Sequence, residues 1–286
     1  MLLIQLLNGM QYAMLLFMLA VGLSVVFGLM NFVNLAHGTL YMIGAFVGFS
    51  TVRHTGSFWI ALFVAPAVAA MIGAAFYATF LSHMQRQGPM KQVLVTFGLI
   101  FVGLDFVRMI WGDNPQSIAP PEVLSGSVIV FGESYPLYRL FIIGLGLLLF
   151  VVLYGLLERT RLGAVIRAGV DDRVMAAALG IDIDRAFFFV FCLGCALAGL
   201  AGVVAAPLLQ IYSGMDMAII IPTLIVVVVG GPGSLVGAFC GALLIGMAET
   251  FGVVFFPTFS SFMIYALLAT VLIVRPGGLV SLRYSR

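Results

Sequence analysis

The sequence predicts an all-α protein, a polytopic bundle of transmembrane helices, and three observations support that fold class. Hydrophobic residues make up 63% of the 286 residues and charged residues 8%, against about 25% charged in a typical soluble domain. The mean hydropathy is +1.21. Several apolar runs reach or approach the ~20 residues that a helix needs to cross a bilayer. We expect a single transmembrane domain over residues 1–286.

The apolar runs divide into about eight to nine membrane segments. They cover residues 9–30, 38–52, 58–81, 92–111, 137–157, 186–207, 218–229, 236–256 and 259–274. Two of them, 38–52 and 218–229, are short for a full span, and Pro222 interrupts the second, so we predict short broken helices there. The start "MLLIQLLNGMQY" lacks the features of a signal peptide, so the first run is expected to be a retained span.

Basic residues in the short loops predict the orientation of the bundle. The loops 82–91 and 158–185 and the C-terminal tail are basic, whereas the loop 112–136 has acidic residues and no Lys or Arg. The basic residues are Arg86, Lys91, Arg159, Arg161, Arg167, Arg173, Arg185, Arg275, Arg283 and Arg286. We therefore expect the basic loops and the C-terminus in the cytoplasm, and the loop 112–136 and the N-terminus outside.

The stretch "DDRVMAAALG" in the loop 158–185 predicts a short helix outside the bilayer. Asp171 or Asp172 can cap its N-terminus, the alanines favour helix, and Gly180 suits the left-handed position that ends a helix. Its small residues allow a partner to approach closely, and an ordinary solvated helix is the alternative. The candidate docking residues are Asp171, Asp172, Met175, Ala176, Ala177, Leu179 and Gly180.

This stretch resembles the cytoplasmic coupling loop of ABC importer permeases, and "MAAALGIDIDR" is similar to the version in branched-chain amino-acid permeases of the LivH type. Three further stretches carry the resemblance: "GLSVVFGLMNFVNLAHGTLYMIGAF" (22–46), "LAGLAGVVAAP" (197–207) and "VVVVGGPGSLVGAFCGALLIGMAE" (226–249). The stretch 213–226 departs from the family pattern. The solute therefore stays open among branched-chain amino acids, other amino acids, urea and short amides.

The resemblance implies a permease subunit of an ABC importer in the bacterial inner membrane. The implied partners are a second, homologous permease, two ATP-binding cassette subunits, an external solute-binding protein and membrane lipid. No nucleic-acid partner is expected, because the charges are spread over loops. The chain has no GxxxxGK[ST] motif and its sole lysine is Lys91, so we expect no catalytic residue or cofactor here and ATP on a partner subunit.

Polar and glycine residues beside the two short segments are the candidate lining of a solute pathway. Interrupted segments in transporters expose backbone groups that water or solute must satisfy. The candidates are Asn34, His37, Gly38, Gly231, Gly233, Ser234 and Glu249. His37 is expected at a cytoplasmic turn, where a packing role is favoured over a ligand role. Glycines at spacing four, such as Gly44 and Gly48, predict close helix packing, with pathway lining as the alternative.

Isolated polar residues in the apolar runs suggest further contacts. Glu249 must face the bundle interior, a cavity or a segment end, because an unpaired carboxylate in lipid is costly. Asp105 and Arg108 lie three residues apart on one predicted helix and are expected to pair. Cys192 and Cys195 form a CxxC without a second pair or a nearby His, which favours small buried hydrophobes over a metal or redox site.

Two other function classes stay open. A secondary transporter or channel would need no ATPase, but it would usually hold more charge inside the membrane than Glu249. An intramembrane enzyme would need a nucleophile with a base, yet His37, His54 and His83 lie near predicted segment ends. No metal site is expected.

Overall fold

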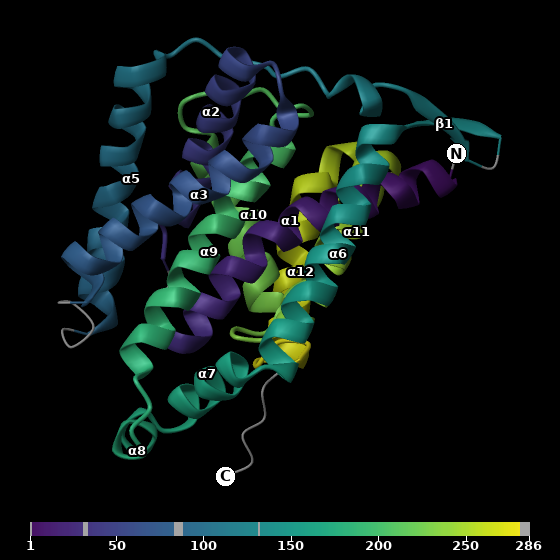
Figure 1. Ribbon diagram of the computed structural model, residues 1–286. Coiled ribbons are helices and arrows are strands. Elements are labelled where there is room, and N and C mark those ends of the chain that lie inside the picture. Colours follow the sequence, from purple (N-terminus) through teal and green to yellow (C-terminus); the bar gives the residue numbers. More distant parts are fainter. Residues whose placement is uncertain (1, 31–33, 83–87, 131, 281–286) are drawn as a thin grey trace.

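The computed structural model describes residues 2–30, 34–82, 88–130 and 132–280, and it confirms an all-α bundle (Figure 1). Its longer helices are α1 (Leu2–Met30), α2 (His37–Thr55), α3 (Phe58–Phe76), α5 (Pro89–Trp111), α6 (Leu137–Arg159), α9 (Ile183–Ala205), α10 (Met215–Gly230), α11 (Leu235–Phe255) and α12 (Ser260–Val274). A π-helical turn, η1 (Tyr77–Leu81), continues α3. The predicted apolar segments therefore all fall on helices.

Short elements connect these helices. Two helices, α7 (Arg161–Asp171) and α8 (Arg173–Ala178), occupy the basic loop, and 3₁₀ turns lie at η2 (Glu122–Leu124) and η3 (Pro257–Phe259). One antiparallel hairpin pairs β1 (Ser127–Val130) with β2 (Glu133–Pro136), with Ser127 opposite Pro136. The sequence pattern suggested neither α7 nor the hairpin.

Six helices in the described part of the chain are long and apolar enough to cross a bilayer. They start at Leu2, Phe58, Met90, Leu137, Ile183 and Leu235. The apolar stretches of α10 and α12 are shorter. Helix α2 has 19 residues, but its last turn carries Arg53 and His54. Helix α2 continues to Thr55, beyond the apolar run predicted to end at residue 52, and it ends at the left-handed Gly56, whose amide donates to the Val52 carbonyl.

Helix α1 is the centre of the bundle (Figure 1). Of the residues in its apolar stretch, 78% are buried, and it contacts α6, α9, α10 and α11. Small residues make this possible. A Cβ atom added to Gly246 of α11 would lie 2.7 Å from the Ala13 backbone, and one added to Gly22 would lie 2.8 Å from the Gly194 carbonyl oxygen, so neither position has room for a side chain. The helices approach backbone to backbone, which packs a membrane bundle where no water drives association.

The glycines at spacing four pack against neighbouring helices, as predicted. A Cβ added to Gly44 would come within 2.5 Å of Gly199 on α9, and one added to Gly48 within 2.5 Å of Val203. Gly237 and Gly241 of α11 face the backbone of α10 in the same way. This arrangement holds α2 on α9 and α10 on α11 at distances that a larger residue would not allow.

The two ends of the bundle differ. Helices α7 and α8 lie at the same end as the last described residues, and the hairpin lies at the opposite end near the start of α1 (Figure 1). Arg86, Arg283 and Arg286, which contributed to the predicted orientation, lie outside the described residues. The predicted Asp105–Arg108 pair is wrong: Arg108 Nε lies 3.0 Å from Asp113 Oδ1, because α5 ends at Trp111 and the chain folds back over its last turn.

Candidate functional site

Both ends of α8 have the predicted caps. Asp172 Oδ1 accepts a hydrogen bond from the Met175 amide at 2.9 Å, so Asp172 caps the helix, while the side chain of Asp171 lies outside what the structure describes. Gly180 has φ of +81°, and the Ile181 amide reaches back to the Ala176 carbonyl at 3.2 Å. Local sequence thus fixes where this short helix begins and ends.

The candidate docking residues of α8 divide into a buried anchor and an exposed face. Ala176 is 3% exposed and packs with Ile183 and Phe187, which ties α8 to the start of α9. Met175 is 58% exposed and Leu179 is 74% exposed, and Asp172, Ala177 and Gly180 are exposed beside them. Large apolar side chains exposed at the basic end of the bundle are typical of a protein-binding surface.

The turn before α2 lies deep in the bundle, which corrects its predicted position. His37 is buried, and its Nε2 lies 3.1 Å from the carbonyl oxygen of Leu19. Leu19 is about 16 Å along the helix from the C-terminal end of α1, at ~1.5 Å per residue. The chain therefore turns back inward before α2 begins, and the prediction that His37 sits at the cytoplasmic edge is wrong. The backbone contact of His37 supports the packing role.

A buried polar contact joins the N-terminal ends of α2 and α10. Thr39 Oγ1 donates to Asp216 Oδ2 at 3.1 Å, and Asp216 is 3% exposed in the first turn of α10. A carboxylate there is favoured by the positive end of the helix dipole. A Cβ on Gly38 would come within 2.8 Å of the Asp216 carbonyl, so Gly38 lets the two helices meet. The predicted short segments therefore form the continuous helices α2 and α10, which start beside each other.

Sequence reasoning missed Asp216. The predicted segment began at residue 218, although "SGMD" carries a helix-start signal, an acidic residue just ahead of an apolar run. Its partner Thr39 is far away in the chain and carries no such signal.

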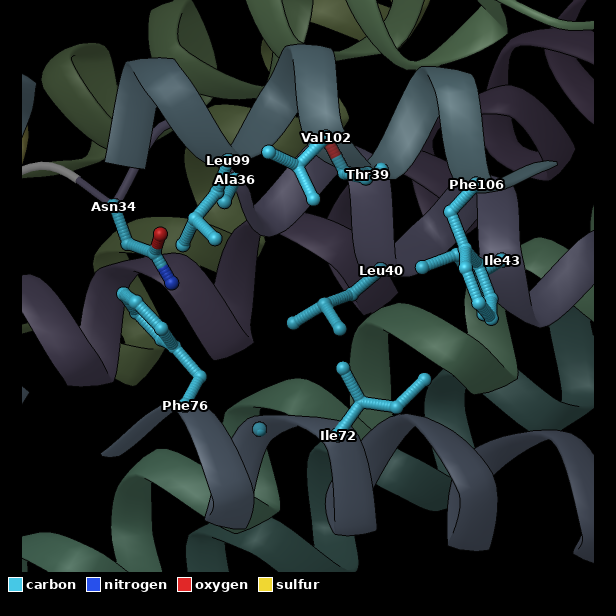
Figure 2. A pocket seen from close by; sticks show the side chains of 12 residues that line it. Asn34, Ala36, Thr39, Leu40, Ile43, Ile72, Phe76, Leu99, Val102 and Phe106 are labelled. Carbon is cyan, nitrogen blue, oxygen red and sulfur yellow. The ribbon is translucent and has the colours of Figure 1, made fainter. Parts of the chain in front are cut away.

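An apolar cavity of about 260 Å³ lies between α2, α3 and α5 (Figure 2). Aliphatic and aromatic side chains such as Leu40, Ile72 and Phe106 form its wall. Asn34 points into it, is 1% exposed, and its Oδ1 has no hydrogen-bond partner among the described residues. A charged solute would lose its hydration here without gaining a counter-charge, so this cavity is a poor place for a zwitterion.

The turn 230–234 between α10 and α11 is enclosed by protein. The Gly233 amide lies 3.2 Å from both the carbonyl and the hydroxyl oxygen of Ser24 on α1. Ser234 Oγ accepts from the Gly237 amide at 2.9 Å and caps α11. Gly231 and Gly233 have φ of +103° and +81°, a backbone conformation that favours glycine.

The segment after α12 completes this enclosure. The amides of Leu279 and Val280 donate to the carbonyls of Val229 and Gly230 at 2.8 and 3.1 Å. The last carbonyls of α10, which a helix cannot satisfy by itself, are thereby paired with protein groups.

Glu249 lines a second cavity, of about 310 Å³, between α1, α10, α11 and α12. The Tyr12 hydroxyl and the Glu249 carboxyl group interact at this cavity. One carboxyl oxygen, Oε2, is buried without a hydrogen-bond partner among the described residues. The sequence predicted that Glu249 would face a cavity or the bundle interior, and the cavity is found. Tyr12 had no sequence signal, because its partner lies on a distant helix.

The candidate pathway residues form separate groups that all touch α1. The first group, with Asn34, His37 and Gly38, reaches α1 at Leu19. The second, with Gly231, Gly233 and Ser234, reaches it at Ser24. Glu249 reaches it at Tyr12. Within the described residues, no three His, Cys, Asp or Glu side chains gather to hold a metal ion, and Cys192 and Cys195 are free thiols.

Comparison with known proteins identifies the family. Residues 5–272 match the family model described as "Branched-chain amino acid transport system / permease component". The chain belongs to this family.

Several curated relatives cover nearly the whole chain. The permease protein BraD of the high-affinity branched-chain amino acid transport system of Pseudomonas aeruginosa is 30% identical, over 96% of this chain and 94% of its own. LivH of Escherichia coli is 28% identical over the same shares of the two chains. LivM of Escherichia coli is 29% identical over 92% of this chain and 67% of its own. The resemblance to LivH-type permeases drawn from the motifs is confirmed.

Proposed function

We propose that this chain is a permease subunit of an ABC importer that moves branched-chain amino acids inward across the bacterial inner membrane. The observation that carries the proposal is the family match over residues 5–272, in a chain with six helices able to span a bilayer. BraD and LivH, which are similar over nearly their whole length, are named as permease proteins of such systems. The energy would come from ATP bound by a partner subunit.

The assembly would hold this chain as one permease domain, residues 1–286, with a second, homologous permease, two ATP-binding cassette subunits and an external solute-binding protein. The similarity to both LivH and LivM supports two related permeases, because these proteins are named as permeases of one system in one organism. The exposed apolar residues Met175 and Leu179 support docking of an ATPase subunit at α8.

The orientation would place α7, α8 and the C-terminus in the cytoplasm, and the hairpin and the N-terminus outside. The basic residues of the loop 158–185 support it. Counting α2, α10 and α12 as membrane segments gives about nine, with α2 and α10 as helices that start inside the bundle. Such starts are typical of the region where transporters handle their solute.

The solute route would run past α1. Every candidate group lies against this helix: His37 near Leu19, Gly233 near Ser24 and Glu249 near Tyr12. Glu249 supports the route most strongly, because its cavity mixes polar and apolar walls, whereas the cavity at Asn34 is apolar.

Transport by the purified complex tests the function. The tagged chain would be purified from its native host with its partners and reconstituted in liposomes, and uptake of radiolabelled leucine, isoleucine, valine and urea would be measured with and without ATP. We expect ATP-dependent uptake of the branched-chain amino acids. Uptake without ATP would contradict the ABC assignment, and uptake of urea alone would contradict the solute.

The variant Ala177→Arg tests the docking helix in the same preparation. It adds bulk and charge to an exposed position of α8, and we expect solute-stimulated ATP hydrolysis to fall by about tenfold or more, a loss of ~1.4 kcal/mol of coupling free energy. Arg161→Ala, at the start of α7, is the matched control and should retain coupling. Normal ATP hydrolysis and transport in Ala177→Arg would rule out α8 as the coupling element.

A further inference from the structure

We propose that the cavity beside Glu249 is a binding site for the ammonium group and aliphatic side chain of an amino acid, within the permease itself. This inference rests on the proposed function, and it adds a solute contact that family membership does not supply. The chemistry of the residues that line the cavity supports both the ammonium contact and the aliphatic contact.

The polar part of the wall consists of oxygen atoms that can accept hydrogen bonds. Glu249 Oε2 is buried and has no hydrogen-bond partner among the described residues, and the Tyr12 hydroxyl interacts with the same carboxyl group. Tyr265 adds a second hydroxyl from α12. A carboxyl group with an unpartnered oxygen in a membrane bundle is either protonated or paired with a cationic or donor group, since an unpaired charge there is costly.

Helix α10 contributes a further acceptor. Pro222 lies inside α10 and has no amide hydrogen, so the carbonyl of Ala218, four residues earlier, lacks its regular helical donor. Both residues line the cavity. The lining residues therefore include a carboxyl group and a residue whose backbone carbonyl lacks its helical donor, and such groups bind an ammonium ion by charge-assisted hydrogen bonds.

The remaining wall is aliphatic. Ile221 and Ile225 of α10 face the cavity with Val253 of α11 and Ile264 of α12. The volume of about 310 Å³ is at the small end of the range for ligand pockets, ~300–1,000 Å³. A bare inorganic cation would leave this apolar surface without a partner. An amino acid with a branched aliphatic side chain satisfies both parts of the wall.

The cavity is open at the surface of this chain. Ile221 is 48% exposed, Val253 is 54% exposed and Tyr265 is 52% exposed. Glu249 lies in the half of α11 that is remote from the turn 230–234, and Tyr12 lies in the half of α1 nearer its N-terminus. In the proposed orientation this half of the bundle is the outer one, where an external binding protein would release its cargo.

Protection of a reporter cysteine tests binding directly. The reporter is Ile221→Cys in the complex, with Cys192, Cys195 and Cys240 replaced, and the measurement is its rate of reaction with a small water-soluble thiol reagent. We expect leucine and 3-methylbutylamine to slow the reaction, and 4-methylpentanoate, which lacks the ammonium group, to leave it unchanged. A reporter at Val123→Cys, in the loop before the hairpin, should show no protection.

The variant Glu249→Gln separates binding from a structural role. Gln can still accept from Tyr12 and has nearly the same shape, so the contact between α1 and α11 is kept while the charge is lost. We expect the leucine concentration needed for protection to rise by about tenfold, the loss expected for one charge-assisted hydrogen bond. Leucine uptake should fall with it. Glu122→Gln, an exposed carboxylate outside the bundle, is the matched control and should change neither quantity.

The outcomes distinguish this inference from the function on which it rests. Protection by leucine without ATP-driven uptake would uphold the site and overturn the function. ATP-driven uptake with unchanged protection and uptake in Glu249→Gln would overturn the site. Protection by sodium chloride, relative to choline chloride, with none by leucine would show an inorganic cation site and overturn the amino-acid assignment.

Discussion

Helices α6 and α9 have the same length, 23 residues, yet they occupy different environments. Helix α6 is the more apolar of the two, but 22% of the residues in its apolar stretch are buried, against 67% in α9. Hydropathy therefore identifies both helices as membrane segments without telling which one meets protein. In a bilayer, lipid tails are as apolar as leucine, so apolarity alone gives neither helix a reason to pack.

Small residues account for the difference. In α9, a Cβ on Gly199 would come within 2.9 Å of the Ala65 carbonyl, and one on Gly202 would clash with the Tyr41 carbonyl. In α6, a Cβ added to Gly144 or Gly155 would meet nothing within 4 Å, whereas one added to Gly146 would come within 2.7 Å of Met14 on α1. Glycine thus marks close contacts in α9 and one close contact in α6, and the rest of the α6 glycines lie on an open surface. The α9 glycines lie among Ala198 and Ala201, which are buried.

The largest expected effect comes from enlarging a glycine on each helix. Gly202→Leu should destabilise the bundle by about 3 kcal/mol or more, since the contact is with backbone that cannot move aside. Gly155→Leu should change stability by less than about 1 kcal/mol, because the site is open and leucine favours helix. Melting temperatures of the purified protein in one detergent measure both. Equal melting temperatures for the two variants would show that close glycine packing does not distinguish α9 from α6.

A medium effect is expected from removing side-chain volume. Leu197→Ala in α9 empties a site that is 6% exposed and should lower the free energy of unfolding by about 2 kcal/mol. Leu148→Ala in α6, at a site 58% exposed, should have little effect, because lipid or detergent fills the space. Chemical denaturation of both variants in the same micelles provides the values. A larger loss for Leu148→Ala would show that protein covers this face of α6.

The smallest expected effect concerns the hydrogen bond that ties α6 to α9. The Tyr138 hydroxyl donates to the Val204 carbonyl at 2.7 Å, and both groups are buried. Tyr138→Phe should cost about 1 kcal/mol. Tyr154→Phe, at an exposed position of α6, is the control and should be neutral within error. An unchanged melting temperature in Tyr138→Phe would mean that packing alone holds the N-terminal end of α6.

Much of the fold follows from local sequence. Apolar runs locate the long helices, and the caps at Asp172 and Gly180 depend on residues within one turn of each other. Signals of this kind involve residues close together in the chain, so they can be read from the sequence alone. The extension of α2 to Thr55 is harder to predict, because its last turn is polar and lies beyond the apolar run.

The candidate site was predicted only in part, because its contacts join distant segments. The sequence pointed to Glu249 as a residue that needs a cavity, but nothing in it pairs Glu249 with Tyr12. In the same way it does not pair Asp216 with Thr39. The sequence also did not show how deep in the bundle His37 lies, since a turn at the surface and a turn inside the bundle can have similar local sequences. Long-range pairing is a property of the packed helices.

The contacts of Leu279 and Val280 with the end of α10 also determine when, during synthesis of the chain, this end of α10 is completed. Residues 275–280 follow α10, α11 and α12 in the chain, so they leave the ribosome after these helices, because synthesis proceeds from the N-terminal side. Until those residues arrive, the carbonyls of Val229 and Gly230 lack the amides that pair with them in the finished protein. The turn 230–234 therefore gains its last protein partners at the end of synthesis.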